Sequence, residues 1–187
     1  AQIKKDIFDI SYELYRKHNP KFNSKKYQSD NFDYFVLKAK KEKLTEITGS
    51  IYDACKKIRG FYEIMGNKKL LDLSAKIIGS NKIGLLPRGF GMRIDYPKDT
   101  NFILKAHQDS SFYPQDGSTR QSLVCNISLH NITANMGSTI LYKNSHISGN
   151  LSYNKKFSHS KKRSTQRQIK EKKLDDFKEI TIETKPG

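Results

Sequence analysis

The chain has 187 residues, of which 35% are hydrophobic, and a formal net charge of +16 from 35 Lys and Arg against 19 Asp and Glu. This length suits one domain with a sizeable core, and the absence of any apolar run of about eighteen residues excludes a transmembrane helix. The N-terminus lacks the apolar stretch of a secretory signal, and the two cysteines form no Cys-x-x-Cys pair. We therefore expect a cytoplasmic protein with reduced thiols and no membrane partner.

Residues 1–79 are predicted to be helical, because apolar residues recur there with helical spacing. The first stripe ends before Asn19-Pro20 and consists of Ile3, Ile7, Ile10 and Leu14. The second consists of Leu44, Ile47, Ile51, Cys55, Ile58 and Tyr62, and is broken at Gly66-Asn67. The third is Leu70, Leu73 and Ile77, which Gly79 terminates. Such stripes are typical of packing faces, so we assign them no chemistry.

Residues 80–187 change to the short β-branched and aromatic segments that predict strands. These segments are 82–86, 90–96, 102–107, 121–131, 137–142 and 177–184. Apolar residues alternate with other residues from Leu123 to Leu129, which predicts a strand with one face, including Cys125, in a core. Helices followed by strands indicate an α+β chain, folded as one domain over 1–187, whose β part is a sandwich or barrel.

The segment from Lys155 to Lys173 contains nine basic residues and one acidic residue. It is rich in Ser and Gln, so we predict a mobile basic loop at about 150–175. Such charge can attract nucleic acid. No recognition motif accompanies it, however, and Lys, Asn and Ile are frequent throughout, so we expect a charge-biased surface without a nucleic-acid partner.

His107 and Asp109 are two residues apart at the end of a predicted strand. Side chains at i and i+2 of a strand point to the same face, so an imidazole nitrogen and a carboxylate oxygen can converge on one ion. Two legs of a facial triad need this geometry, with a third histidine coming from elsewhere. His-x-Asp alone is a weak motif that often arises by chance, and in isolation a surface pair at a strand end is the better explanation.

The residues from Arg93 to Gly149 add context, because they resemble the phytanoyl-CoA dioxygenase family of iron(II)/2-oxoglutarate oxygenases. In that family a strand leads into His-x-Asp, and a loop, an alternating strand, an Asn- and Gly-containing turn and a Pro-Gly-Ser-His turn follow. This chain has His107-Gln108-Asp109, the alternating segment Ser122 to Leu129, a turn ending in Met136-Gly137, and Lys143-Asn144-Ser145-His146. Lys143-Asn144 replaces the usual Pro-Gly, and Asn144 can take the positive φ that Gly supplies.

The resemblance implies a double-stranded β-helix (jelly-roll or cupin-like) core with the N-terminal helical region packed against it. It implies that His107 and Asp109 bind Fe(II), that 2-oxoglutarate is the co-substrate, and that dioxygen is used to hydroxylate a small molecule. Asp109 favours hydroxylation, because the related halogenases lack this carboxylate. The basic surface favours an anionic substrate.

Further site residues also follow from the resemblance. Arg93 and Asn126 correspond to positions that line the 2-oxoglutarate pocket in the family. Independently of the resemblance, the segment Ser110 to Tyr113 directly follows the ligand pair, and its Phe112 and Tyr113 either form a substrate wall or pack the loop.

Two other histidines of the β region, His130 and His146, are not expected to bind the metal. His130 is interpreted as a rim or surface residue, and His146 matches a non-ligand histidine of the family. The family's third ligand and the Arg that holds 2-oxoglutarate follow a strand that resembles Glu179 to Thr184. We expect them, with the remaining core strands, after Gly187. Two alternatives stay open: a degenerate binding protein of the same fold, and a basic nucleic-acid-binding protein.

Overall fold

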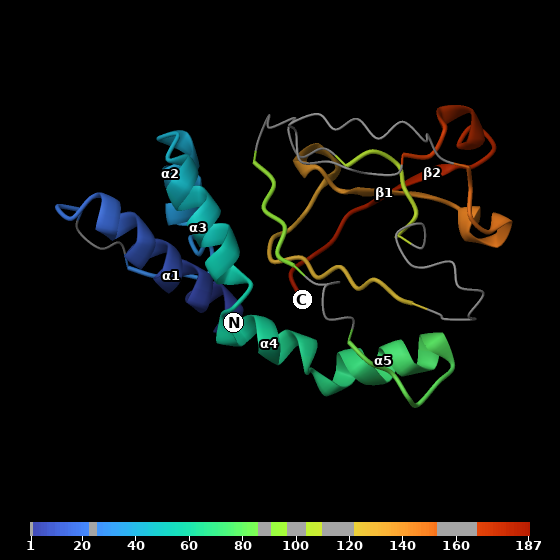
Figure 1. The fold of residues 1–187 in the computed structure, drawn as a ribbon, viewed down its shortest axis with the longest axis horizontal. Coiled ribbons are helices and arrows are strands. Elements are labelled where there is room, and N and C mark those ends of the chain that lie inside the picture. Colours follow the sequence, from blue (N-terminus) through green and yellow to red (C-terminus); the bar gives the residue numbers. More distant parts are fainter. Residues whose placement is uncertain (1, 23–25, 86–90, 97–103, 110–121, 153–167) are drawn as a thin grey trace. The chain divides into compact units, whose positions relative to one another are not determined.

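The computed structural model describes residues 2–22, 26–85, 91–96, 104–109, 122–152 and 168–187 (Figure 1). The chain forms two compact units, Ala1–Ile94 and Asp95–Gly187. The first unit contains helices and the second a small antiparallel sheet, which confirms the α+β class. Across the described ranges, none of the helices combines the length and apolar character that crossing a membrane requires.

Five α-helices make up the described part of the first unit: α1 (Gln2–His18), α2 (Tyr34–Lys41), α3 (Thr45–Cys55), α4 (Arg59–Met65) and α5 (Lys68–Ile78). Helix α1 packs against α2, α3 and α4, and α2 also packs against α3 (Figure 1). The predicted ends before Asn19-Pro20, at Gly66 and at Gly79 are confirmed. The second predicted stripe, however, covers two helices instead of one, and its last member, Tyr62, is exposed.

The core of the first unit is aromatic. The fully buried ring of Phe35 has its centroid 5.3 Å from that of Phe8, 5.2 Å from Tyr12 and 5.0 Å from Tyr34. Most of these contacts are edge-on, an arrangement that favours each pair by about 1 kcal/mol beyond burial. The buried face of α1 is rotated from the predicted stripe and consists of Ile3, Ile7, Phe8, Ser11 and Tyr15.

A polar network links α1 to the end of α2. The Tyr15 hydroxyl donates to Glu42 Oε2 (2.7 Å), and Lys38 Nζ lies 2.9 Å from Glu42 Oε1. The hydrogen bond from Lys38, followed by that from Tyr15, lowers the pKa of Glu42. Burial, and then the bond to Glu42, raises the pKa of Tyr15.

Cys55 is confirmed as a buried thiol on the inner face of α3, next to the buried Ile51 one turn earlier. Burial raises the pKa of Cys55 to about 12. A thiol of this kind stays protonated at neutral pH and is a poor nucleophile.

Helices α1 and α4 meet at a buried glycine, Gly60. Its backbone N–H donates to Asp6 Oδ2 (2.8 Å), which satisfies one of the amides that a helix N-terminus leaves unpaired. A Cβ at this position would lie 2.6 Å from Ile3 Cα and 2.7 Å from Ile3 N. The close approach of the two helices therefore requires glycine.

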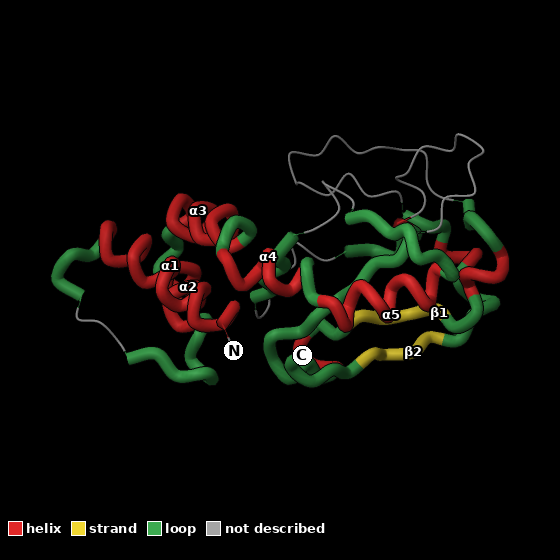
Figure 2. Tube along the Cα trace, turned by 90° about the horizontal axis from the view of Figure 1, so that it is seen from below, coloured by secondary structure: helices red, strands yellow, loops and turns green. Residues whose placement is uncertain are grey.

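The second unit contains strands β1 (Thr139–Tyr142) and β2 (Glu179–Ile182), which lie side by side (Figure 2). They pair antiparallel, from Thr139 opposite Ile182 to Tyr142 opposite Glu179. Both strands fall within predicted segments, 137–142 and 177–184, which are confirmed. The pairing continues at an isolated bridge, where Ile132 N donates to Thr184 O (2.8 Å) and Thr184 N donates back (3.0 Å).

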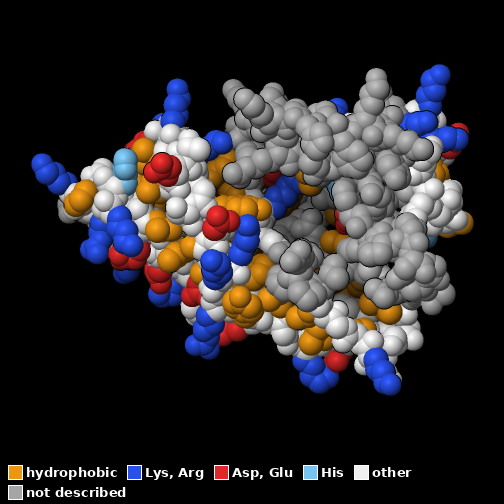
Figure 3. Space-filling model, viewed as in Figure 1, with side chains coloured by type: hydrophobic (Ala, Val, Ile, Leu, Met, Phe, Trp, Pro, Cys, Tyr) orange, Lys and Arg blue, Asp and Glu red, His pale blue; other side chains and the backbone are white. Residues whose placement is uncertain are grey.

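The other four predicted strands are wrong as far as they are described. The described residues of 82–86, 90–96, 102–107 and 121–131 form no helix or strand. A strand needs a hydrogen-bonded neighbour and a face to bury, whereas Leu123 and Cys125, both on the predicted core face, are exposed. Hydrophobic side chains reach the surface in both units (Figure 3). The single domain over 1–187 stays a prediction.

Candidate metal centre

The candidate site lies in the second unit on residues 104–109, which backbone hydrogen bonds attach to a later part of the chain. Ile169 N donates to Ala106 O (2.9 Å), directly before His107. Lys170 N donates to Ser152 O (3.2 Å), which brings the segments 149–152 and 168–170 together. Ile169 is 7% exposed and is buried at this junction. The His-x-Asp tripeptide is therefore held by residues more than forty positions away along the chain.

The side chains of His107 and Asp109 come together, since His107 Nε2 lies 3.3 Å from Asp109 Oδ1, although residues 104–107 do not form the strand that was expected to align them. His107 Nδ1 lies 2.7 Å from Lys105 O. A carbonyl oxygen only accepts, so Nδ1 must carry the proton and donate it. In the neutral imidazole, Nε2 then keeps its lone pair on the side of the Asp109 carboxylate. When the ring is protonated, the same two atoms form an ion pair.

The geometry of the pair fits a metal ion. Two donors that occupy neighbouring octahedral positions at about 2.1 Å from an ion lie about 3 Å apart. The observed 3.3 Å between Nε2 and Oδ1 is close to this value. Metal-binding histidines usually donate their second ring N–H to a carbonyl or carboxylate, which is the bond that Lys105 O accepts. The side chains are 22% and 47% exposed, so the pair is open to solvent on one side.

No role was predicted for Gln108, which lies between the two candidate ligands. Its Nε2 donates to Gly149 O (2.9 Å), and its Oε1 accepts from Leu151 N (2.7 Å). The amide therefore bonds the backbone at two residues, as a neighbouring strand would. The only sequence signal for this role was its position between two residues that share a face.

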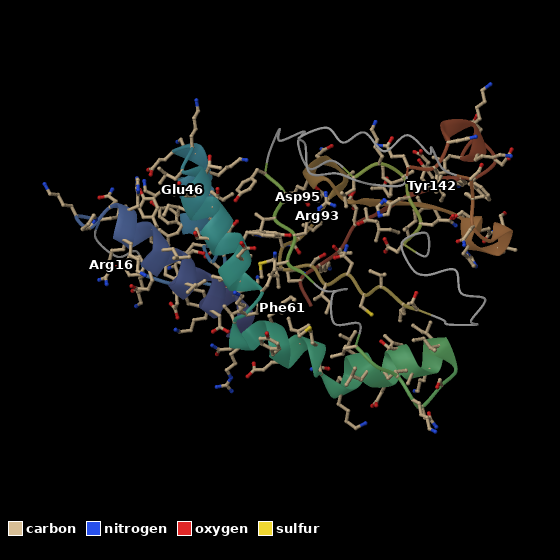
Figure 4. All side chains as sticks on the ribbon, in the orientation of Figure 1. Arg16, Glu46, Phe61, Arg93, Asp95 and Tyr142 are labelled. Atoms are coloured by element: carbon tan, nitrogen blue, oxygen red, sulfur yellow. The ribbon has the colours of Figure 1, made fainter. Side chains whose placement is uncertain are left out.

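The two residues predicted to contact 2-oxoglutarate belong to different units of the chain. Arg93 is exposed on a stretch of the first unit without helix or strand (Figure 4). Asn126 is exposed in the second unit. Their shared 2-oxoglutarate pocket stays a prediction. Phe112 and Tyr113 lie outside the described residues.

No third metal ligand is found in the part of the chain that the structure describes, since no group of three His, Cys, Asp or Glu side chains there is arranged to hold a metal. His130 is half-buried, and His146 is exposed on the short 3-10 helix η4 (Ser145–Ser148). Before that helix, Asn144 has φ 64°, so the expected left-handed residue in place of Gly is confirmed.

Comparisons with known proteins add no relative, because the chain matches no protein-family model, no curated protein and no solved structure.

Proposed function

We propose that this chain belongs to an iron(II)/2-oxoglutarate-dependent oxygenase of the phytanoyl-CoA dioxygenase type that hydroxylates a small molecule. One observation supports this proposal most directly: His107 Nε2 and Asp109 Oδ1 are 3.3 Å apart while Nδ1 is oriented by Lys105 O. An imidazole with its second nitrogen fixed, next to an exposed carboxylate, is the donor set that two legs of a facial triad require.

The proposal includes a double-stranded β-helix for the β part of the chain. Two features of the second unit support it: the antiparallel β1–β2 pair and the continuation of this pairing at Ile132 and Thr184. In such a core, His-x-Asp lies where one strand ends, and the later strands supply the remaining groups. The third ligand and the arginine that holds 2-oxoglutarate remain predictions.

Each residue of the proposed site has a definite task. Iron(II), with 2-oxoglutarate and dioxygen, supplies the oxidising chemistry that converts a C–H bond into an alcohol while 2-oxoglutarate is decarboxylated. His107 and Asp109 would hold the metal, through Nε2 and a carboxylate oxygen. Lys105 O fixes the ring orientation of His107. Arg93 and Asn126 are proposed contacts for the carboxylates of 2-oxoglutarate.

Anaerobic titration of the protein with iron(II) in the presence of 2-oxoglutarate tests the proposal. We expect a visible metal-to-ligand charge-transfer band for the wild type, and its loss in His107→Ala and Asp109→Ala. His18→Ala is the matched control, because His18 is exposed at the end of α1 in the other unit and should leave the band unchanged.

The alternatives predict different outcomes. A degenerate binding protein of the same fold would give neither the band nor any 2-oxoglutarate turnover in the whole protein, and that result would refute the enzyme proposal. A nucleic-acid-binding protein would bind random DNA in the micromolar range with a steep loss of affinity as salt increases.

A further inference from the structure

Gln108 connects the two candidate metal ligands to a distant part of the chain through both ends of its side-chain amide. The donor end reaches Gly149 O at 2.9 Å, and the acceptor end receives Leu151 N at 2.7 Å. Both lengths are those of well-formed hydrogen bonds. The two partners are two residues apart, so one flat amide spans the distance between successive ladder positions of a strand.

The orientation of this amide has no alternative. A backbone N–H only donates and a backbone carbonyl only accepts. Exchanging Nε2 and Oε1 would therefore place one acceptor against another and one donor against another. The side chain is therefore fixed along its whole length. With both polar atoms bonded, the side-chain torsions of Gln108 are restricted, and the position of its backbone is restrained.

The fixed residue lies between the two ligands. His107 and Asp109 direct Nε2 and Oδ1 towards one another at 3.3 Å, whereas Gln108 reaches the segment 149–151. Ala106, the residue before His107, is also held, because its carbonyl accepts from Ile169 N at 2.9 Å. The backbone that sets the separation of Nε2 and Oδ1 is thus attached to two other segments.

We propose that Gln108 is the positioning residue of the metal centre: its amide, clamped on Gly149 and Leu151, holds His107 and Asp109 at the separation that one ion needs. This inference rests on the proposed function of the His107–Asp109 pair and adds to it how the pair is preorganised. Groups that orient metal ligands typically change metal affinity by about 10–100-fold when they are removed. Gln108 should fall in this range although it does not touch the ion.

Cobalt(II), which is stable in air and reports its coordination through its visible spectrum, is the probe for the test. The whole protein is titrated with cobalt(II) alone, as wild type, Gln108→Asn, Gln108→Met and His107→Ala. Asn is one methylene too short to reach both partners, and Met has a similar length but forms neither bond. Gln28→Asn is the matched control, because Gln28 is exposed, lies in the other unit, and donates to Asn31 Oδ1 through its backbone N–H. Urea unfolding of each variant reports stability separately.

We expect cobalt(II) affinity to fall about 10-fold or more in both Gln108 variants, with an altered visible spectrum, while Gln28→Asn matches the wild type. A purely structural role would lower the urea midpoint but leave the affinity and spectrum of the folded protein unchanged, and that result would overturn the proposal for Gln108 alone. If the wild type binds no cobalt(II), or if His107→Ala binds it equally well, both the proposed function and the role of Gln108 are refuted.

Discussion

Replacing Gly60 by alanine should destabilise the helical unit, although alanine is the better helix former. The new Cβ would lie 2.6 Å from Ile3 Cα, whereas ordinary van der Waals contact begins at 3.4 Å. Helices α1 and α4 must therefore separate by about 0.8 Å, because the close-packed backbone of Ile3 cannot rotate away as a side chain can.

The expected magnitude follows from three contributions. Overpacking costs about 1–3 kcal/mol, and loosening the 2.8 Å bond from Gly60 N to Asp6 Oδ2 costs about 1 kcal/mol more. The higher helix propensity of alanine returns about 1 kcal/mol. We therefore expect the free energy of unfolding to fall by about 2 kcal/mol.

Urea unfolding followed by circular dichroism at about 222 nm measures this change, because all α-helices that the structure describes belong to the first unit. Gly49→Ala is the matched control: Gly49 lies within α3, and a Cβ there meets nothing within 4 Å. That variant should gain about 0.5–1 kcal/mol. The reasoning is refuted if Gly60→Ala is as stable as the wild type or more stable.

Three further predictions concern the thiols, a carboxylate and a helix cap. A thiol reagent at neutral pH should modify the exposed Cys125 in the native protein and the buried Cys55 only after unfolding, and rapid modification of native Cys125→Ser would contradict this. Lys38 lowers the pKa of Glu42 below its unfolded value of 4.5. The ionised Glu42 carboxylate therefore stabilises the fold above that value, and this stabilisation is lost as pH falls through the folded pKa. The stability difference between wild type and Glu42→Gln should thus shrink from pH 6 to pH 3, and a constant difference would rule this out. Asn67→Ala removes the side chain that accepts from two backbone amides at the start of α5. Hydrogen exchange of the α5 amides should therefore become faster by a factor that corresponds to about 1 kcal/mol. Unchanged exchange would show that the cap contributes nothing.

Helical periodicity predicted much of the first unit, because an amphipathic helix buries its stripe locally and its ends have chemical signals. Asn19-Pro20 and Gly79 marked two ends correctly, and Ile51 and Cys55 are buried where the stripe placed them. The sequence did not reveal the break between α3 and α4. Just after that break, Gly60 lies against α1, in a tertiary contact between residues far apart in the chain that no local pattern indicates.

Strand prediction succeeded only where a partner strand is present. β1 and β2 pair with one another, whereas Leu123 and Cys125 lie on the apolar face of a strongly alternating segment and are nevertheless exposed. Alternation shows that a segment is able to form a half-buried strand, but the hydrogen-bonded neighbour comes from elsewhere in the chain.

The candidate site shows the same division between local and distant information. The i, i+2 spacing of His107 and Asp109 led to the prediction that their side chains converge, and they do, although the strand on which this prediction relied is not formed at 104–107. The partners of Gln108 lie more than forty residues away, and no local pattern indicates them. The tautomer of His107 depends on the Lys105 carbonyl, which the residue types alone do not indicate.

The bond between Lys170 N and Ser152 O closes the chain on itself next to the candidate metal centre. Because Gln108 bonds Gly149 and Leu151 while Ala106 bonds Ile169, this closure joins the two anchors of the tripeptide to one another. A substitution that displaces either anchor should therefore also affect the other, and with it the backbone from Ala106 to Asp109.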